Sequence, residues 1–396
     1  MRRLRLAAAV VLVCVAFHGM DPVLLPWVVA QLIKCLWPFH SAAAASLQAW
    51  SWTHWEQERL GHEFVEESIA ELAPGTQPQS LDTPFVVRRL LQRNGTTTTT
   101  SMLDANEWLL RPPVSELVID YFSNASVEDG IVPDARGSLG EVVRSIIAGG
   151  SAKIGTEKIF RAFPHLLEEL GVAASVGPLL GASGEQRLAA SRLGLSLTVP
   201  VFMATGAPQA RTDLHCEPIG NMALQLGGRK RWTLVPPGES RYLRPTLSRD
   251  GRAYFQSEVP PTQDPKGSLA HVRRWVVETD TVRQRPAATP PSAARRTSIF
   301  LSIFHQPSTA HRTHICHSPP ASFGQRKPDA HSWPWPQGDA LWVPTWTWHR
   351  VDYLPQQTAV SASLFHFRWE QTPQNSLYTA LAVPNVIKEL VGWKTQ

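Results

Sequence analysis

The chain has 396 residues, of which 43% are hydrophobic, with 33 prolines and 15 tryptophans but only 5 tyrosines. This apolar content suffices for one large domain with extensions, and the proline content favours a loop-rich β architecture over a helical bundle. The 4 scattered cysteines exclude a disulfide framework and a cysteine-based zinc pattern. The formal net charge of +5 comes from a single segment, described below, so it does not indicate nucleic-acid binding.

Residues 1–39 have the features of a signal peptide or membrane anchor. Three arginines within the first five residues precede an apolar run from Leu6 to Phe17, which is the order of charge and hydrophobicity in a secretory signal. The run is shorter than the ~20 apolar residues that span a bilayer. A second apolar stretch, Val23 to Phe39, either extends the first into a membrane anchor or packs at a membrane surface or on the domain.

Two N-glycosylation sequons support entry into the secretory pathway. They are Asn94-Gly-Thr96 and Asn124-Ala-Ser126, which accept glycans only in that compartment. We therefore expect a location in the secretory pathway or endomembranes, such as the endoplasmic reticulum, with possible membrane association through the N-terminus. An organellar presequence or a misassigned start is the alternative.

Residues 40–80 are interpreted as a linker followed by a polar helix. The run Ala42 to Ala45 has low complexity, and apolar residues in Glu56 to Leu72 have roughly helical spacing.

Helical spacing of apolar residues recurs before the middle of the chain. The segments Glu116 to Phe122, Leu139 to Ile147 and Glu157 to Leu170 each place apolar residues three and four apart. Leu195 to Phe202 then has the pattern of a β-strand.

A pair of metal-ligand residues follows this strand. His215 and Glu217 are two positions apart, so on a β-strand both side chains point to the same face. His349, which follows a tryptophan far downstream, would supply a third ligand. Two imidazoles and one carboxylate form the facial triad of non-haem Fe(II) oxygenases. Each residue alone is more often packed or solvated than a ligand, but their combination with the motifs below favours a metal site.

A predicted pair of strands follows directly. Apolar residues alternate on both sides of Gly227-Gly228, which predicts two half-buried strands joined by a tight turn. The second strand would return Lys230 to the metal, where an ammonium can hold the distal carboxylate of a dicarboxylate whose 2-oxo acid end chelates iron. The alternative is a solvated lysine between Arg229 and Arg231 on an exposed hairpin.

Residues 281–337 differ in composition from the rest of the chain. These 57 residues hold 9 prolines, 5 histidines and 7 basic residues against one acid, Asp329. They contribute +6 to the net charge of +5, so the remainder of the chain carries about −1. This composition predicts disorder. We interpret the segment as an insertion, either a retained intron or a real loop of this lineage, because Trp275 to Thr279 would otherwise run directly into Gly338.

At these motifs the chain resembles the JmjC and cupin-like Fe(II)- and 2-oxoglutarate-dependent oxygenases, most nearly the branch containing the asparaginyl hydroxylase of hypoxia-inducible factor. The resemblance rests on Thr212, three residues before His215, on Asn221, six after it, and on Lys230, fifteen after it. A second block, Gly338 to His349, is similar to the family's Gly-Asp turn and its Trp-rich run into the ligand histidine.

The resemblance implies roles for individual residues. Thr212, Asn221 and Lys230 would contact 2-oxoglutarate, and Ser363 or a neighbour stands where the family has a late Asn that also binds it. The carboxylate ligand is Glu217, where the hydroxylase branch has Asp and the histone demethylase branch has Glu.

The fold that the resemblance implies is mainly β with flanking helices: a double-stranded β-helix, the cupin jelly roll. It would cover residues 81–370, interrupted by the insertion at 281–337, and be followed by a helical tail at 371–396.

The activity that the resemblance implies is that of a dioxygenase using Fe(II) and 2-oxoglutarate. It would hydroxylate a side chain of a protein or peptide partner, while nucleic acid is not an expected partner. Two alternatives are a catalytically silent cupin-like binding protein and a JmjC protein demethylase. The signal-like N-terminus and the lack of zinc-finger patterns disfavour the demethylase.

Overall fold

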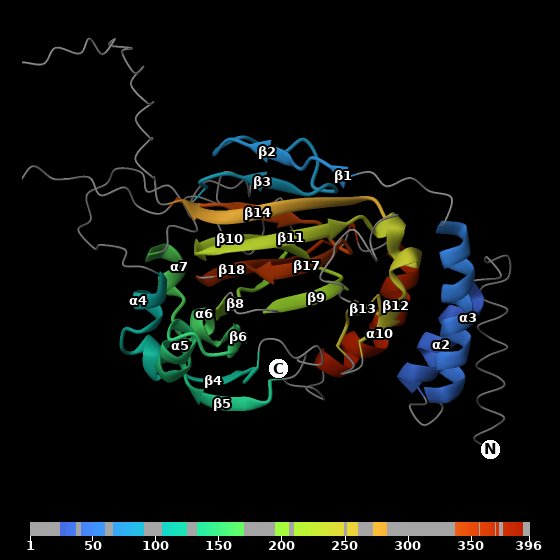
Figure 1. The fold of residues 1–396 in the computed structure, drawn as a ribbon, viewed down its shortest axis with the longest axis horizontal. Coiled ribbons are helices and arrows are strands. Elements are labelled where there is room, and N and C mark those ends of the chain that lie inside the picture. The colour runs from blue at the N-terminus through green and yellow to red at the C-terminus, as the bar shows by residue number, and fades with distance from the viewer. Residues whose placement is uncertain are drawn as a thin grey trace, which may run out of the picture. The chain divides into compact units, whose positions relative to one another are not determined.

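The computed structural model describes residues within 1–282 and 337–396, which cluster as one unit (Figure 1). The described residues are 24–36, 41–59, 66–90, 105–124, 133–169, 195–205, 210–248, 252–259, 272–282, 337–355, 357–368, 370–371 and 375–390. The segment Arg283–Pro336, and with it the hypothesis of a disordered insertion, lies outside the described residues.

Two eight-stranded sheets form most of this unit. In spatial order, the first contains β1 (Glu66–Glu67), β14 (Arg274–Val282), β11 (Arg229–Val235), β17 (Trp348–Tyr353), β9 (Arg211–Cys216), β13 (Phe255–Ser257) and β12 (Pro245–Leu247), with β15 (Gln337–Gly338) paired to β14. The second contains β2 (Ala70–Leu72), β3 (Phe85–Val87), β16 (Ala340–Val343), β10 (Gly220–Gly227), β18 (Thr358–Phe367), β8 (Val201–Thr205) and β6 (Lys153–Thr156), with β7 (Leu195–Thr198) paired to β18.

Two runs of consecutive strands alternate between the two sheets. Strands β8 and β10 lie in the second sheet, whereas β9 and β11 lie in the first, and β16, β17 and β18 alternate in the same way. A buried apolar cluster joins the sheets, because it includes Trp232 and Val277 from the first and Ala223 and Leu341 from the second. This arrangement is a jelly roll, and the predicted fold class is confirmed.

The prediction that β10 and β11 pair as a hairpin is wrong. Strand β10 pairs with β16 and β18, and β11 with β14 and β17, so the chain crosses between the sheets at Gly228. Gly228 has φ +62°, and a Cβ there would collide with the carbonyl oxygen of Thr358. Glycine is therefore required by both conformation and space, and the Gly-Gly pair marks a corner between sheets.

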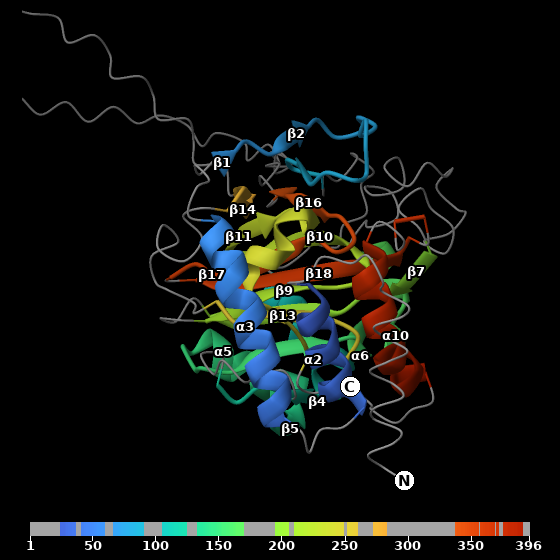
Figure 2. The ribbon, with the colours of Figure 1, turned by 90° about the vertical axis from the view of Figure 1, so that its right-hand side faces the viewer.

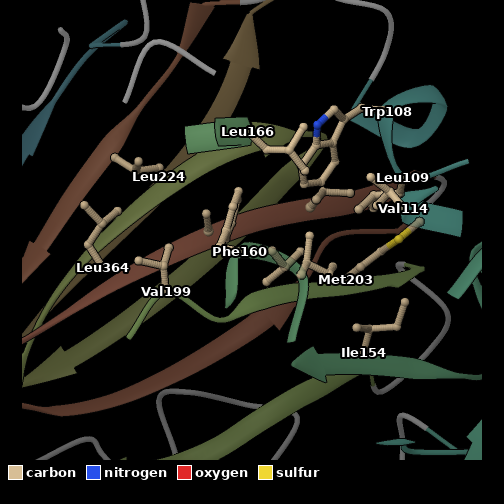
Figure 3. Packing of buried hydrophobic residues seen from close by; sticks show 14 of the residues in the cluster. Trp108, Leu109, Val114, Ile154, Phe160, Leu166, Val199, Met203, Leu224 and Leu364 are labelled. Carbon is tan, nitrogen blue, oxygen red and sulfur yellow. The ribbon is translucent and has the colours of Figure 1, made fainter. Parts of the chain in front are cut away.

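Short helices cover the outer face of the second sheet. They are α4 (Ala105–Leu109), the 3₁₀ helix η2 (Val114–Glu116), α5 (Leu139–Ile147), α6 (Lys158–Ala162) and α7 (His165–Glu169). Figure 3 shows their apolar side chains, such as Trp108 and Phe160, packed against Met203 and Leu364 of the sheet. Helix α5 was predicted correctly, and Ser138 caps it by accepting a hydrogen bond from the Glu141 N–H at 3.4 Å.

Two N-terminal helices, α2 (Leu24–Leu36) and α3 (Ser41–Arg59), pack on the jelly roll. Figure 2 shows them on the same side as α10 (Ser376–Leu390), the helix of the C-terminal tail. Trp27 is fully buried, and its Nε1–H donates to the carbonyl oxygen of Pro245 at 2.7 Å. The second apolar stretch was expected to extend a membrane anchor, to lie at a membrane surface or to pack on the domain. In the structure, its residues 24–36 pack on the domain. None of the helices in the described ranges has the length and apolarity needed to cross a bilayer.

Several local predictions need correction. The alanine run at 42–45 is part of α3 rather than a linker, since alanine is the strongest helix former. The helix predicted for Glu56 to Leu72 ends at Arg59, and β1 and β2 follow it because pairing with β14 and β3 outweighs helical spacing.

Three other segments also differ from the predicted single elements. In Glu116 to Phe122 only Glu116 is helical, as the end of η2; strand β4 (Val118–Tyr121) follows and pairs with β5 (Ala135–Ser138), which suits its β-branched residues. Proline interrupts two more elements, separating α6 from α7 at Pro164 and β7 from β8 at Pro200.

The ends of the predicted insertion lie side by side. Thr281 pairs with Gly338 and Val282 with Gln337 in the antiparallel ladder of β14 and β15. The predicted boundaries of 281 and 337 therefore include strand residues. The ladder brings the two flanks of the inserted segment to adjacent positions in the sheet.

Candidate metal centre

Two neighbouring strands bring together the three predicted ligands. His215 on β9 lies directly opposite His349 on β17, and their ring centroids are 4.1 Å apart. Glu217 follows the end of β9, and ligand atoms of all three residues lie within 4.8 Å of one another. His349 is buried, while His215 and Glu217 are partly exposed. The site is thus held by rigid strands and remains reachable from solvent.

Backbone hydrogen bonds fix the orientation of both imidazoles. His215 Nδ1 lies 2.7 Å from the carbonyl oxygen of Asp213, and His349 Nδ1 lies 3.1 Å from that of Thr347. A carbonyl only accepts hydrogen bonds, so Nδ1 carries the proton in each ring and Nε2 keeps a lone pair. This is the usual arrangement of metal-binding histidines.

The loop that carries Glu217 is tied to the segment before His349. The Trp346 N–H donates to the carbonyl oxygen of Glu217 at 2.8 Å. Trp346 has φ +62°, a left-handed conformation that is rare for a bulky residue and costs on the order of 1–3 kcal/mol. Strain of this kind is concentrated at functional sites, where the surrounding structure maintains it.

The surroundings favour neutral imidazoles. Desolvation lowers the pKa of both His215 and His349 to about 4, with a further lowering by Lys153 for His215 and by His215 for His349. Desolvation raises the pKa of Glu217. Both rings are therefore unprotonated near neutral pH, as metal ligands must be, and a bound cation would stabilise the charged carboxylate. The donor set fits a divalent ion such as Fe(II).

Lys230 lies inside the jelly roll, on strand β11 next to the strand that carries His349. Its side chain is 1% exposed, and its Nζ donates to Ser361 Oγ at 2.6 Å and lies 4.5 Å from the ring centroid of Tyr353. Within the described residues no carboxylate pairs with it. Burial lowers the pKa of Lys230 well below its usual range, and the positive charge of Lys153 is a second, smaller cause of this lowering. The alternative of an exposed lysine on a hairpin is wrong.

Asn221 and Ser363 lie on the same inner face. Ser363 on β18 faces Ala223 on β10, and Asn221 is two residues from Ala223, so all three point inward. Both polar side chains are buried, yet Asn221 Oδ1 and Ser363 Oγ have no hydrogen-bond partner among the described residues. Unsatisfied buried polar atoms are costly and call for an explanation such as a missing ligand.

The remaining predicted contact, Thr212, is joined to a residue that sequence reasoning missed. The Nζ of Lys153 on β6 donates to Thr212 Oγ1 at 3.0 Å and to the carbonyl oxygen of Arg211 at 3.0 Å. Ser361, the partner of Lys230, was also missed. No motif spacing links either residue to the triad, because both arrive through strand register.

The cupin-like domain family has a model that matches residues 147–372, more than half of the chain. The matched region contains the three ligand residues and every predicted co-substrate contact. No curated protein matches the chain.

Proposed function

Because the chain belongs to the cupin-like domain family, we propose that it is a dioxygenase that uses Fe(II) and 2-oxoglutarate. The observation that carries this proposal is the combination, in one interior, of a His-Glu-His triad with a buried lysine that pairs with no acid in the part of the chain that the structure describes. The triad fits Fe(II), and the lysine fits the distal carboxylate of a dicarboxylate. With both bound, the iron and the 2-oxo acid supply oxygen activation, with release of succinate and carbon dioxide.

The residues of the chain hold and orient these groups. His215 and His349 present neutral Nε2 atoms, and Glu217 offsets part of the charge of the ion. Lys230 would bind the distal carboxylate, while Asn221 Oδ1 and Ser363 Oγ are polar atoms without a hydrogen-bond partner in the described ranges. The buried Trp232, whose ring centroid lies 6.3 Å from that of His349, restricts water near this ligand, which strengthens electrostatic interactions within the site.

We further propose that the substrate is a side chain of a protein or peptide, which is then hydroxylated. This step rests on the sequence likeness to the asparaginyl hydroxylase branch, in which Thr212, Asn221 and Lys230 match the co-substrate contacts. Glu217 in place of that branch's Asp leaves the metal chemistry intact, since either carboxylate completes the triad.

We also propose a location in the secretory pathway. The basic and apolar order of the first 17 residues supports it, as does the exposed position of Asn124 in its glycosylation sequon. A glycosidase-sensitive mass shift of the protein expressed in its own cells, lost in Asn124→Gln and Asn94→Gln, would be the expected result. An unmodified mass in those cells would contradict this location.

The activity is tested by following succinate formation from 2-oxoglutarate under air, with and without added Fe(II). We expect iron-dependent succinate in the parent protein and none in His349→Ala. Binding of 2-oxoglutarate without succinate would instead favour the silent binding protein. Formaldehyde released from methylated peptides would indicate a demethylase.

A further inference from the structure

Lys153 occupies an inward-facing position at the edge of the second sheet. It pairs with Ala204 on β8, and Ala204 belongs to a small buried cluster with Tyr353, the ring beneath the ammonium of Lys230. Residues directly opposite in neighbouring strands point to the same face. Lys153 and Lys230 therefore approach the same interior from different sheets.

Several residues along this side of the interior are in partial contact with solvent. Lys153, Phe202 and Thr212 are each partly exposed although they face inward, and so is His215. Phe202 contributes to both lysine environments, because it is next to Gly155 in the β6–β8 pair and lies 5.9 Å from Lys230 Nζ. The partly exposed Lys153, Thr212 and His215 therefore give this side of the interior contact with solvent, while Lys230 lies deeper, at 1% exposure.

Lys153 has no acidic hydrogen-bond partner among the described residues. Its Nζ donates to the Arg211 carbonyl oxygen and to Thr212 Oγ1, and it lies 5.6 Å from the centroid of the Phe122 ring. The nearest acid that influences it, Asp213, is already paired with the Arg211 side chain at 2.7 Å. The lysine thus carries a charge that its own protein neighbours do not neutralise.

Two unneutralised cations in one interior are unfavourable for folding. Desolvation lowers the pKa of Lys153 to about 8 and that of Lys230 well below its usual range, and the charge of Lys153 also lowers the pKa of Lys230. Stability alone would favour neutral side chains at these two positions. A bound anion would offset both charges at once.

We propose that Lys153 is a second ammonium contact for the distal carboxylate of 2-oxoglutarate, which would lie between Lys153 and Lys230 and beside the Thr212 hydroxyl. This inference rests on the proposed function, because it takes that ligand as given. The competing explanation is that Lys153 only ties β6 to β9 through its two hydrogen bonds. The two explanations differ in whether the charge matters for the ligand.

A calorimetric titration of the Mn(II)-loaded protein separates them. The parent protein, Lys153→Met and Lys153→Gln are each titrated with 2-oxoglutarate and with 2-oxovalerate, which lacks the distal carboxylate. The Gln variant keeps a donor for Thr212 without the charge. We expect both variants to weaken 2-oxoglutarate by roughly 10- to 100-fold in Kd, while the Kd of 2-oxovalerate stays within about twofold of the parent value.

Lys158→Met is the matched control, since Lys158 pairs with Asp120 outside the interior. It should leave the Kd of both ligands unchanged. An unchanged Kd for 2-oxoglutarate in Lys153→Gln, or an equal loss for both ligands, would overturn the inference and leave the proposed function standing. Absence of 2-oxoglutarate binding by the parent protein would overturn the proposed function and the inference together.

Discussion

His349 on β17 faces His215 on β9 across a single rung of the ladder, although 134 positions separate them in the chain. A bulge follows immediately in this pair of strands, where the register shifts before Val351 meets Thr212. Bulges of this kind re-aim side chains next to functional sites. The pairing provides two rigidly placed imidazoles for one ion.

Replacing either histidine should remove metal binding. In His215→Ala and His349→Ala, two donors remain, and the loss in affinity for Mn(II) should exceed the roughly 10- to 100-fold typical of changing a hydrogen-bond partner of a ligand. Titration calorimetry in the absence of oxygen measures it. His165→Ala, an exposed histidine on α7, is the control and should bind Mn(II) like the parent. Parent-like binding in either ligand variant would remove that residue from the centre.

Lys230→Met should weaken the binding of 2-oxoglutarate while leaving the binding of Mn(II) intact. Losing one partner of a buried charged hydrogen bond costs roughly 2–5 kcal/mol, on the order of 30-fold or more in Kd. Arg231→Met is the matched control, because Arg231 is on the same strand but pairs with Glu278 at the exposed surface. A Kd within about twofold of the parent in Lys230→Met would show that Lys230 is not the anchor.

Lys230→Met should also raise the free energy of unfolding of the ligand-free protein. The pKa of Lys230 is well below its usual value of 10.5 in the folded state, so its charged form is disfavoured by folding at neutral pH. This cost shrinks as pH rises toward 10.5, where the unfolded lysine also loses its proton. We expect the gain in free energy of unfolding from Lys230→Met, measured by urea unfolding, to be smaller at pH 10 than at pH 7. If Lys230→Met were less stable than the parent at pH 7, the idea that Lys230 is an unneutralised cation in the folded protein would be contradicted.

Affinity for 2-oxoglutarate should fall as pH rises above about 8, the pKa to which burial lowers Lys153. Asp213 raises this pKa and Arg211 lowers it, and Lys230 faces the same interior. Below that pH the ammonium attracts the carboxylate, whereas above it the neutral amine does not. The pH dependence of Kd in the parent should be reduced in Lys153→Met. Identical profiles in the two proteins would contradict this assignment.

Trp27→Ala should destabilise the fold by about 3–5 kcal/mol, since it removes a fully buried indole and its hydrogen bond to Pro245. Trp50→Ala is the control on the adjacent helix, where the side chain is 43% exposed, and it should cost less than about 0.5 kcal/mol. Urea unfolding measures both. Equal effects would show that α2 does not contribute to the core as its packing indicates.

The sequence identified the three residues that the structure brings together as a possible metal site, because their spacing reflects local strand geometry. His215 and Glu217 needed only the two-residue alternation of a strand, and the Trp-rich block located His349. Lys153 and Ser361 were not identified from the sequence. Lys153 reaches Thr212, and Ser361 reaches Lys230, through strand pairings between segments that are remote in the chain. The glycine pair at 227–228 indicated a turn correctly, but nothing local reveals that the strands it joins belong to different sheets.

The nature of the segment between Val282 and Gln337 stays a prediction from composition. Joining these paired residues by an Asn-Gly turn, which suits a two-residue hairpin, should preserve cooperative unfolding and Mn(II) affinity. Loss of folding would show that the segment is required. Sequencing the transcript separately tests the retained-intron hypothesis, which a mature message encoding all residues from 281 to 337 would contradict.

The central claim, that His215, Glu217 and His349 hold the iron at which 2-oxoglutarate binds, is tested most directly by anomalous diffraction. Crystals grown under argon with Fe(II) and 2-oxoglutarate would be measured on both sides of the iron absorption edge. The account predicts one anomalous peak within bonding distance of the Nε2 atoms of both histidines and the carboxylate of Glu217, with ligand density running from it toward Lys230. Iron bound elsewhere, or a triad without a peak in crystals that contain iron, would contradict it.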